Sequence, residues 1–226
     1  MKTIKTVIFG ATGMVGKAVL LECLQDERIK EVTCIARKSL DIKHPKLRVL
    51  VCKDFNNLNE LSSKIQGYNA CYYAIGIPSS GLSEDDYNRI TYDYTITAAE
   101  MLLVNNPNLI FCYVSAKGAD SSEKNNNMWA RVRGKTENTL ISYPFKKFYS
   151  FRIGYVLPMK GVKSNVKNYR IFYALSSPFY GLIKNFPSFA CTSVEVAKAM
   201  INVNYFDYNS SILESRDIVK LSKLNN

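Results

Sequence analysis

Three glycines near the beginning of the chain have the spacing of a turn whose backbone can approach an anion. Gly10, Gly13 and Gly16 lie between an apolar, β-branched run at residues 3–9 and a helix-like run at residues 14–25. In that context the first glycine permits the turn, the second admits a pyrophosphate, and the third allows close helix–strand packing. The helix N-terminus adds free N–H groups. The residues predicted to hold the phosphates of a dinucleotide are Gly10, Ala11, Thr12, Gly13, Met14, Val15 and Gly16.

The end of the next expected strand bears on which dinucleotide would bind. The apolar run at residues 32–36 is followed by Arg37 and Lys38, with no acidic residue in reach. An acid at this point would bind the adenosine ribose hydroxyls of NAD, whereas an arginine accommodates the 2′-phosphate of NADP. Arg37 can pair with a phosphate through two hydrogen bonds, and Lys38 adds charge. The sequence favours NADP(H) over NAD(H), the alternative being a solvated basic loop end.

Short apolar runs alternate with helical patterns along most of the chain. Ser83 is a good N-cap for the longest of these helices. Expected strands cover residues 3–9, 32–36, 47–52, 70–75, 109–114 and 148–153, and expected helices cover 14–25, 58–65, 84–104, 128–141 and 194–203. Residues 211–221 are expected to add a last strand and turn. Strands separated by helices imply βαβ crossovers, so the predicted class is α/β, a doubly wound parallel sheet of the Rossmann type.

The alternation of strand and helix patterns stops after Gly154, where prolines and glycines interrupt an aromatic segment. The chain is expected to be one dinucleotide-binding domain over residues 1–226, with residues 154–193 as a small substrate-pocket or lid region. The aromatic residues of this region are Tyr169, Phe172, Tyr173, Phe179 and Tyr180. They would line an apolar substrate pocket or, as an equal alternative, pack over a sheet edge or an oligomer face.

Composition excludes several classes of protein. The 226 residues are 47% hydrophobic and 22% charged, as in ordinary globular proteins, and no run reaches the roughly 18 apolar residues of a membrane span. The six cysteines are scattered without CxxC spacing, and no targeting segment is evident, so a cytoplasmic protein with reduced thiols is expected. The net charge of +11 would attract an anionic partner, but its even scatter favours a generally lysine-rich surface.

Further stretches, four at the expected strand ends and one in the long expected helix, complete a family pattern. They are Asp54-Phe55, Ala74-Ile75-Gly76, residues 89–94, residues 114–120 and Arg152-Ile153-Gly154-Tyr155. With the glycine turn, this set resembles the atypical short-chain dehydrogenase/reductases, specifically the small NmrA-like group, over nearly the whole chain. The resemblance implies that Asp54 and Phe55 lie near the adenine and that Ala74, Ile75 and Gly76 run beside the cofactor. Arg152 would stand at the mouth of the substrate pocket and contact the cofactor.

The family's proton relay is altered in this sequence. The resemblance implies a serine, here Ser115, and then a tyrosine and a lysine four residues apart on one helix face. Aligned on the following Gly134, Trp129 stands at the tyrosine position and Arg133 at the lysine position. An indole N–H can only donate a hydrogen bond, and arginine does not lose its proton. Arg133 is still expected to hold a ribose or phosphate, whereas Ser115 and Tyr155 are the weak catalytic candidates.

Two functions follow from this pattern. One is an NADP-dependent oxidoreductase that transfers a hydride to a small carbonyl or conjugated substrate, with the proton supplied by the substrate or Tyr155. The other is a non-catalytic dinucleotide-binding redox sensor or partner-binding module, which Trp129 and Arg133 favour. The expected partners are the cofactor and an unidentified small molecule, with a homodimer as an option. No motif indicates nucleic acid, a membrane or a metal, and the lone His44 is expected at the surface.

Overall fold

The computed structural model describes residues 3–162 and 187–224, and within them seven parallel strands form one sheet. Their order is β3-β2-β1-β4-β5-β6-β9, and every neighbouring pair is parallel. The strands are β1 (Ile4–Phe9), β2 (Ile29–Ala36), β3 (Leu47–Val51), β4 (Ala70–Tyr73), β5 (Ile110–Ala116), β6 (Lys147–Ile153) and β9 (Ile212–Glu214). The order reverses between β1 and β4, which is where open α/β sheets bind ligands. The predicted doubly wound fold is confirmed.

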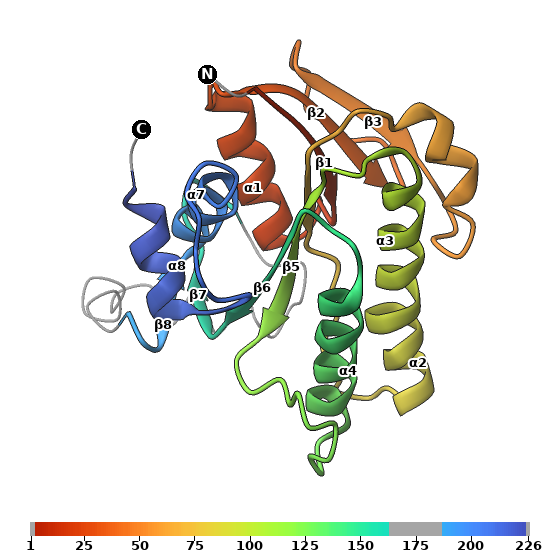
Figure 1. The fold of residues 1–226 in the computed structure, drawn as a ribbon, viewed down its shortest axis with the longest axis vertical. Coiled ribbons are helices and arrows are strands. Elements are labelled where there is room, and N and C mark those ends of the chain that lie inside the picture. Colours follow the sequence, from red (N-terminus) through yellow and green to blue (C-terminus); the bar gives the residue numbers. More distant parts are fainter. Residues whose placement is uncertain (1–2, 163–186, 225–226) are drawn as a thin grey trace.

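Helices cover both faces of this sheet (Figure 1). One face carries α1 (Met14–Gln25), α7 (Ser193–Asn202) and α8 (Ser215–Ser222), and the other carries η1 (Asn59–Lys64), α2 (Glu84–Asn88), η2 (Arg89–Asp93), α3 (Tyr94–Asn105) and α4 (Met128–Ser142). Alternate strand residues serve the two faces. In β1, Ile8 packs toward α1, whereas Val7 and Phe9 pack toward α3, as the period of two along a strand requires.

Several elements differ from the sequence prediction. The long helix is interrupted by a single π-helical segment, η2, and the helix expected at 58–65 is the short 3₁₀ helix η1. The turn expected after the last strand is instead the helix α8, because Glu214 and Asp217 form reciprocal side-chain caps at its start. A two-stranded parallel sheet of β7 (Tyr155–Leu157) and β8 (Ala190–Thr192) was not predicted. Ser83 caps α2 as expected, since its Oγ accepts from the Asp86 N–H.

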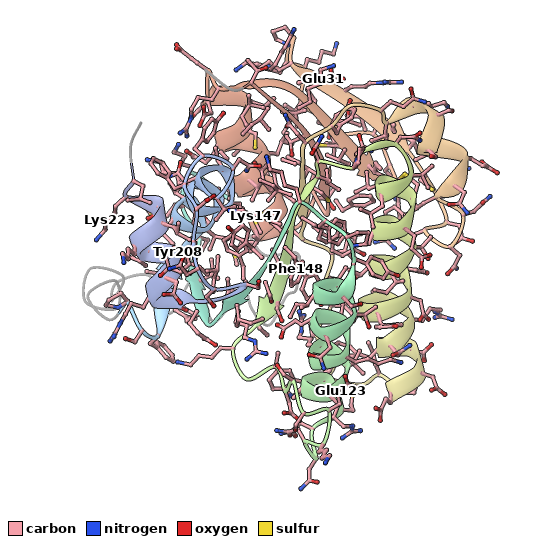
Figure 2. All side chains as sticks on the ribbon, viewed as in Figure 1. Glu31, Glu123, Lys147, Phe148, Tyr208 and Lys223 are labelled. Carbon is pink, nitrogen blue, oxygen red and sulfur yellow. The ribbon has the colours of Figure 1, made fainter. Side chains whose placement is uncertain are left out.

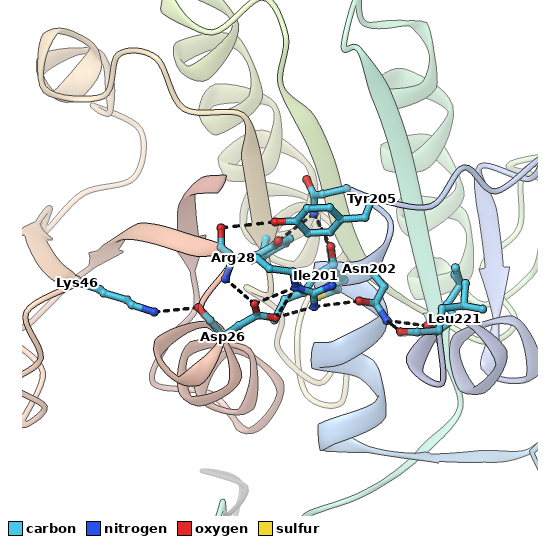
Figure 3. Close-up of polar contacts among 11 residues, drawn as sticks. Asp26, Arg28, Lys46, Ile201, Asn202, Tyr205 and Leu221 are labelled. Carbon is cyan, nitrogen blue, oxygen red and sulfur yellow. Dashed lines mark hydrogen bonds and ion pairs between the residues drawn. The ribbon is translucent and has the colours of Figure 1, made fainter. Parts of the chain in front are cut away.

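The amino ends of the strands are closed by a polar network between α1 and α7 (Figure 3). Arg28 pairs with Asp26 at 2.6 Å and also donates to Asn202 Oδ1 at 3.2 Å. Asn202 in turn donates to the carbonyl of Leu221 on α8, and Lys46 donates to the carbonyl of Asp26. Glu31 lies near this end of the molecule and Glu123 at the opposite end, beyond the carboxyl ends of the strands (Figure 2).

The six cysteines form no disulfide; five are buried and Cys52 is partly exposed. Burial raises the pKa of the Cys34 thiol and of the Cys191 thiol to about 12 each. At neutral pH these thiols are therefore protonated and unreactive, which agrees with their expected role as core side chains. No helix among the described residues is long and apolar enough to cross a membrane.

Candidate dinucleotide site

The glycine turn is enforced by backbone contacts at its first and third glycines. Gly10 has φ +78°, and a Cβ on it would lie 2.5 Å from the carbonyl oxygen of Ala74. A Cβ on Gly16 would lie 2.1 Å from the carbonyl oxygen of Gly10. Between them, the Gly13 N–H donates to the Gly10 carbonyl at 2.9 Å. Because real Cβ atoms do not approach backbone this closely, the turn needs glycine at 10 and 16 to bring β1, β4 and α1 together.

The N-terminus of α1 opens directly from this turn and has no side-chain cap. Gly13 is the N-cap residue, so it offers no hydroxyl or carboxylate, and the first turn contains no acidic residue. The first intrahelical bond runs from the Lys17 N–H to the Gly13 carbonyl. The N–H groups of residues 14–16 therefore have no acceptor within the helix. The positive end of the helix dipole and these N–H groups make the turn suited to a phosphate.

The residues expected around the adenine side lie at the carboxyl ends of β2 and β3. Arg37 and Lys38 follow β2, both are exposed, and neither forms an ion pair with a described residue. Asp54 is exposed, and its carboxylate accepts from the Asn56 backbone N–H at 2.9 Å. Phe55 is a core side chain whose ring packs edge-on against Phe9. Arg37 and Lys38 are thus available to an anion, whereas Phe55 packs in the core beside the last residue of β1.

On the other side of β1, Arg133 reaches from α4 to the turn that follows β4. Its Nε donates to the hydroxyl of Tyr87 at 3.0 Å, and its Nη1 donates to the carbonyl of Val114 at 3.2 Å. A Cβ on Gly76 would lie 3.4 Å from its Nη2. The stretch Ala74–Gly76 therefore lies between the glycine turn and this guanidinium, and its place beside a cofactor stays a prediction.

Ser115 lies at the end of β5, on the face of the sheet that α4 covers. It is 2% exposed, and its Oγ has no hydrogen-bond partner among the described residues. The Oγ of Thr91, in the π-helical segment η2 that packs on α4, is similarly buried and unpartnered. A buried hydroxyl without a partner costs free energy, so a polar ligand atom at this position would stabilise the protein.

Trp129 occupies the expected tyrosine position on the first turn of α4 and points toward the loop after β5. A Cβ on Gly118, which has φ +92°, would lie 3.2 Å from the tip of the indole. Trp129 thus packs at the carboxyl edge of the sheet four residues, about one helical turn, before Arg133. The loop that leads to it is held by the Asp120 carboxylate, which accepts from the Lys124 and Asn125 N–H groups. These hydrogen bonds contribute to the lowered pKa of Asp120, in which the bond from Ser122 is the largest factor.

Arg152 is committed to a buried ion pair. Its Nη2 lies 2.5 Å from Oε2 of Glu137, a fully buried carboxylate on α4, and it also donates to Ser121 Oγ at 2.8 Å. Ser150 Oγ donates to the same carboxylate at 2.7 Å. The hydrogen bond to Glu137 raises the pKa of Arg152. A contact between Arg152 and a cofactor stays a prediction, since these partners already occupy much of its guanidinium.

Tyr155 begins β7 beside the pocket mouth that the family resemblance implies. Its ring stacks on Phe189 with centroids 6.3 Å apart, and Phe189 is 58% exposed. Gly154 is required here, because a Cβ would lie 2.6 Å from the Phe189 carbonyl oxygen. The aromatic residues Tyr169, Phe172, Tyr173, Phe179 and Tyr180 lie outside the described residues.

The sequence did not predict the roles of Tyr87 and Glu137. Tyr87 accepts a hydrogen bond from Arg133, and Glu137 pairs with Arg152. Tyr87 is 46 positions from Arg133 in the chain, and no local pattern marks it. Glu137 lies four residues after Arg133, where helical spacing predicts an exposed partner for the arginine rather than a buried one for Arg152. Among the described residues no group of three or more histidines, cysteines and acids could hold a metal ion.

Comparison with known proteins finds one relative that is similar over nearly the whole chain. Protein HTATIP2 of Rattus norvegicus is 25% identical over 229 residues, a match that covers 99% of this chain and 91% of that protein. This confirms the resemblance to the atypical short-chain dehydrogenase/reductases. No protein-family model matches the chain.

Solved structures of this fold superpose on nearly the whole chain. A UDP-N-acetylglucosamine 4-epimerase from Methanobrevibacter ruminantium, in complex with UDP-N-acetylmuramic acid, gives a TM-score of 0.68 at 19% identity over 92% of this chain and 75% of that one. The Bordetella bronchiseptica enzyme WbmF in complex with NAD⁺ gives 0.66 at 13% identity, over 96% and 77%. At these identities the likeness establishes the Rossmann-type fold alone.

Proposed function

We propose that this chain binds a nicotinamide dinucleotide on the Gly10–Gly16 turn, with the phosphates at the N-terminus of α1. The observation that carries the proposal is the forced approach of Gly10 and Gly16 to neighbouring backbone beside an uncapped helix end. The unpartnered Oγ of buried Ser115 also fits a polar ligand that extends along the β4–β5 edge. WbmF, whose structure is similar, is in complex with NAD⁺, which supports a nicotinamide dinucleotide as the ligand.

The preferred dinucleotide is NADP(H). Arg37 and Lys38 follow β2, where the adenosine ribose lies in this fold, and both side chains are exposed with no described ion-pair partner. A 2′-phosphate would give Arg37 two charge-assisted hydrogen bonds that a ribose hydroxyl does not offer to the same extent.

The proposed activity is reduction of a small carbonyl or conjugated substrate. When bound, the reduced dinucleotide supplies a hydride to the substrate carbon. Ser115 would donate a hydrogen bond to the substrate oxygen, because its hydroxyl has no described partner. Tyr155 is the proposed source of the proton unless the substrate supplies it, since Trp129 has no acidic proton to give.

A second candidate function is dinucleotide binding without turnover, as in a redox sensor. The observation that favours it is Trp129 itself, whose indole fills the first turn of α4 where the family has its acid. The glycine turn serves both functions equally, so the two are separated by turnover and not by binding.

The binding proposal is tested with the chain's own fluorophore. Trp129 is the only tryptophan, so its emission should be quenched by energy transfer when NADPH or NADH is titrated into the protein. NADPH should bind at least about tenfold tighter than NADH, and Arg37→Ala should remove most of that difference, given the strength of a charged hydrogen bond. Arg48→Ala is the matched control, because Arg48 is an exposed arginine on β3 that donates a hydrogen bond to the Lys64 carbonyl and lies outside the proposed site. Equal loss in both variants, or no quenching at all, contradicts the proposal.

Turnover is measured with the same protein. Consumption of NADPH against a panel of aldehydes and ketones supports the reductase, whereas tight binding with no consumption supports the sensor.

A further inference from the structure

The guanidinium of Arg133, at the proposed substrate end of the site, has N–H groups that no described residue accepts. Of its five N–H groups, one donates to Tyr87 and one to the Val114 carbonyl. The remaining three are not used by any described residue, and Nη2 is the nitrogen closest to Gly76. The two bonds that are made fix the plane of the guanidinium, so the free side of the fork has a defined direction.

The lack of a carboxylate partner distinguishes Arg133 from comparable arginines. Within residues 3–162 and 187–224, the partly buried arginines are Arg28, Arg131, Arg133 and Arg152. Arg28 pairs with Asp26, Arg131 with Glu84 and Arg152 with Glu137, whereas Arg133 has only two neutral oxygens. A partly desolvated cation that forms no ion pair is costly, and a bound anion would offset that cost.

The position of Arg133 shows which anion could reach it. The pyrophosphate of a dinucleotide belongs at the N-terminus of α1, between β1 and β4. Arg133 lies one strand farther along, between the ends of β4 and β5, and its Val114 contact is the residue next to Ser115. Carboxylate oxygens match the planar fork of a guanidinium, and a carboxylate held here would place an adjoining carbonyl group near the Ser115 hydroxyl.

We infer that Arg133 binds the carboxylate of the substrate, so the chain acts on carbonyl compounds that carry a carboxylate next to the reacting carbon. This inference rests on the proposed function for the reaction but concerns a separate group of the site. Tyr87 strengthens it: its oxygen accepts from Arg133, and its O–H proton, which no described residue accepts, is available to the second carboxylate oxygen.

The test uses two 2-oxo acids and their methyl esters, which differ in charge at the same carbon skeleton. Pyruvate, methyl pyruvate, phenylglyoxylate and methyl phenylglyoxylate are each titrated into the full chain by calorimetry, with and without saturating NADP⁺. At least one acid should bind at least about tenfold tighter than its ester, and Arg133→Gln should remove that preference. Arg131→Gln, two residues away on the same helix but paired with Glu84, should keep it. Tyr87→Phe should weaken acid binding by less than Arg133→Gln does.

The outcomes separate this inference from the proposed function. Acids that bind no better than their esters, or an acid preference that survives Arg133→Gln, overturn the inference. If Arg133→Gln weakens NADP⁺ binding and leaves the acids unaffected, Arg133 is a cofactor residue, and the inference fails while dinucleotide binding stands. If NADP⁺ does not bind but the acid preference depends on Arg133, the proposed function fails and the anion site stands.

Discussion

The buried pair of Glu137 and Arg152 is expected to contribute more to stability than any other ion pair described above. Glu137 is fully buried, and its carboxylate accepts from Ser150 Oγ and from two nitrogens of Arg152, whose side chain is 15% exposed. Replacing Glu137 by leucine introduces an apolar side chain of similar size. It leaves the guanidinium of Arg152 without its carboxylate partner. Removing one partner of such a pair costs about 3–5 kcal/mol. This is a large part of the roughly 5–15 kcal/mol by which a domain is stable.

The assay is urea unfolding at neutral pH, with matched variants to isolate the cause. If the cost arises from the stranded charge, Glu137→Leu with Arg152→Met should recover about 2 kcal/mol of it, leaving about 1–3 kcal/mol for the unpartnered Ser150 hydroxyl. Asp207→Ala is the surface control, because Lys147 and Asp207 form an exposed pair that should contribute less than about 1 kcal/mol. A loss below 1 kcal/mol in Glu137→Leu, or a double variant less stable than the single one, would refute the reasoning.

Three further predictions follow from the geometry. Gly67→Ala introduces only backbone strain, because Gly67 has φ +71° and open space around it, and should cost about 1–2 kcal/mol of stability. Gly10→Ala adds a clash with the Ala74 backbone, so it should cost more and also abolish NADPH binding. Equal free energies of unfolding for the two variants in a urea titration would contradict this. Burial raises the pKa of Asp26, but the hydrogen bonds from Arg28 outweigh it, so the pKa lies below its ordinary value. The stability that this pair contributes is therefore present at neutral pH and lost as the pH falls through the lowered pKa. Asp26→Asn should lower the free energy of unfolding by about 1–2 kcal/mol at pH 7, and this loss should shrink below about pH 4 when unfolding is measured across a series of acidic pH values. A loss that stays constant with pH argues against the prediction. Finally, Trp129→Tyr combined with Arg133→Lys restores the family's acid and its cation, so NADPH consumption against aldehydes should rise at least about tenfold; unchanged consumption would count against a masked reductase.

The sequence predicted those parts of the fold that depend on local periodicity and glycine chemistry. The bounds of α1, Met14–Gln25, are as predicted, and the glycine turn lies where the strand–helix boundary placed it. The π-helical segment Arg89–Asp93 was not predictable, because its hydrophobic pattern is continuous with the helices on either side. The pairing of β7 with β8 joins segments separated by more than 30 residues, and neither three-residue strand has a pattern of its own.

The residues of the candidate site also fall into those that the sequence predicts and those that it does not. Positions fixed by backbone geometry, such as Gly10 and Gly16, could be read from spacing. The partners of charged side chains could not, because they come from other elements: Arg152 finds Glu137 on α4, and Arg133 finds Tyr87 on α2. The family resemblance named Arg133 and Arg152 together, but only the structure shows that one has a carboxylate and the other does not.

The two ends of the sheet differ in how completely their polar groups are satisfied, and this difference indicates where a ligand belongs. At the amino end, Arg28 has Asp26 and Asn202, and Asn202 has the carbonyl of Leu221 (Figure 3). At the carboxyl end, α1 begins without a cap, the hydroxyl of Ser115 has no described partner, and Arg133 has no described counter-charge. Folding alone favours pairing such groups, so an uncapped helix end, an unpartnered serine hydroxyl and an arginine without an ion pair at the same edge indicate that a bound molecule partners them there. As proposed above, the phosphates of that molecule lie at α1, a carbonyl oxygen at Ser115 and a carboxylate at Arg133.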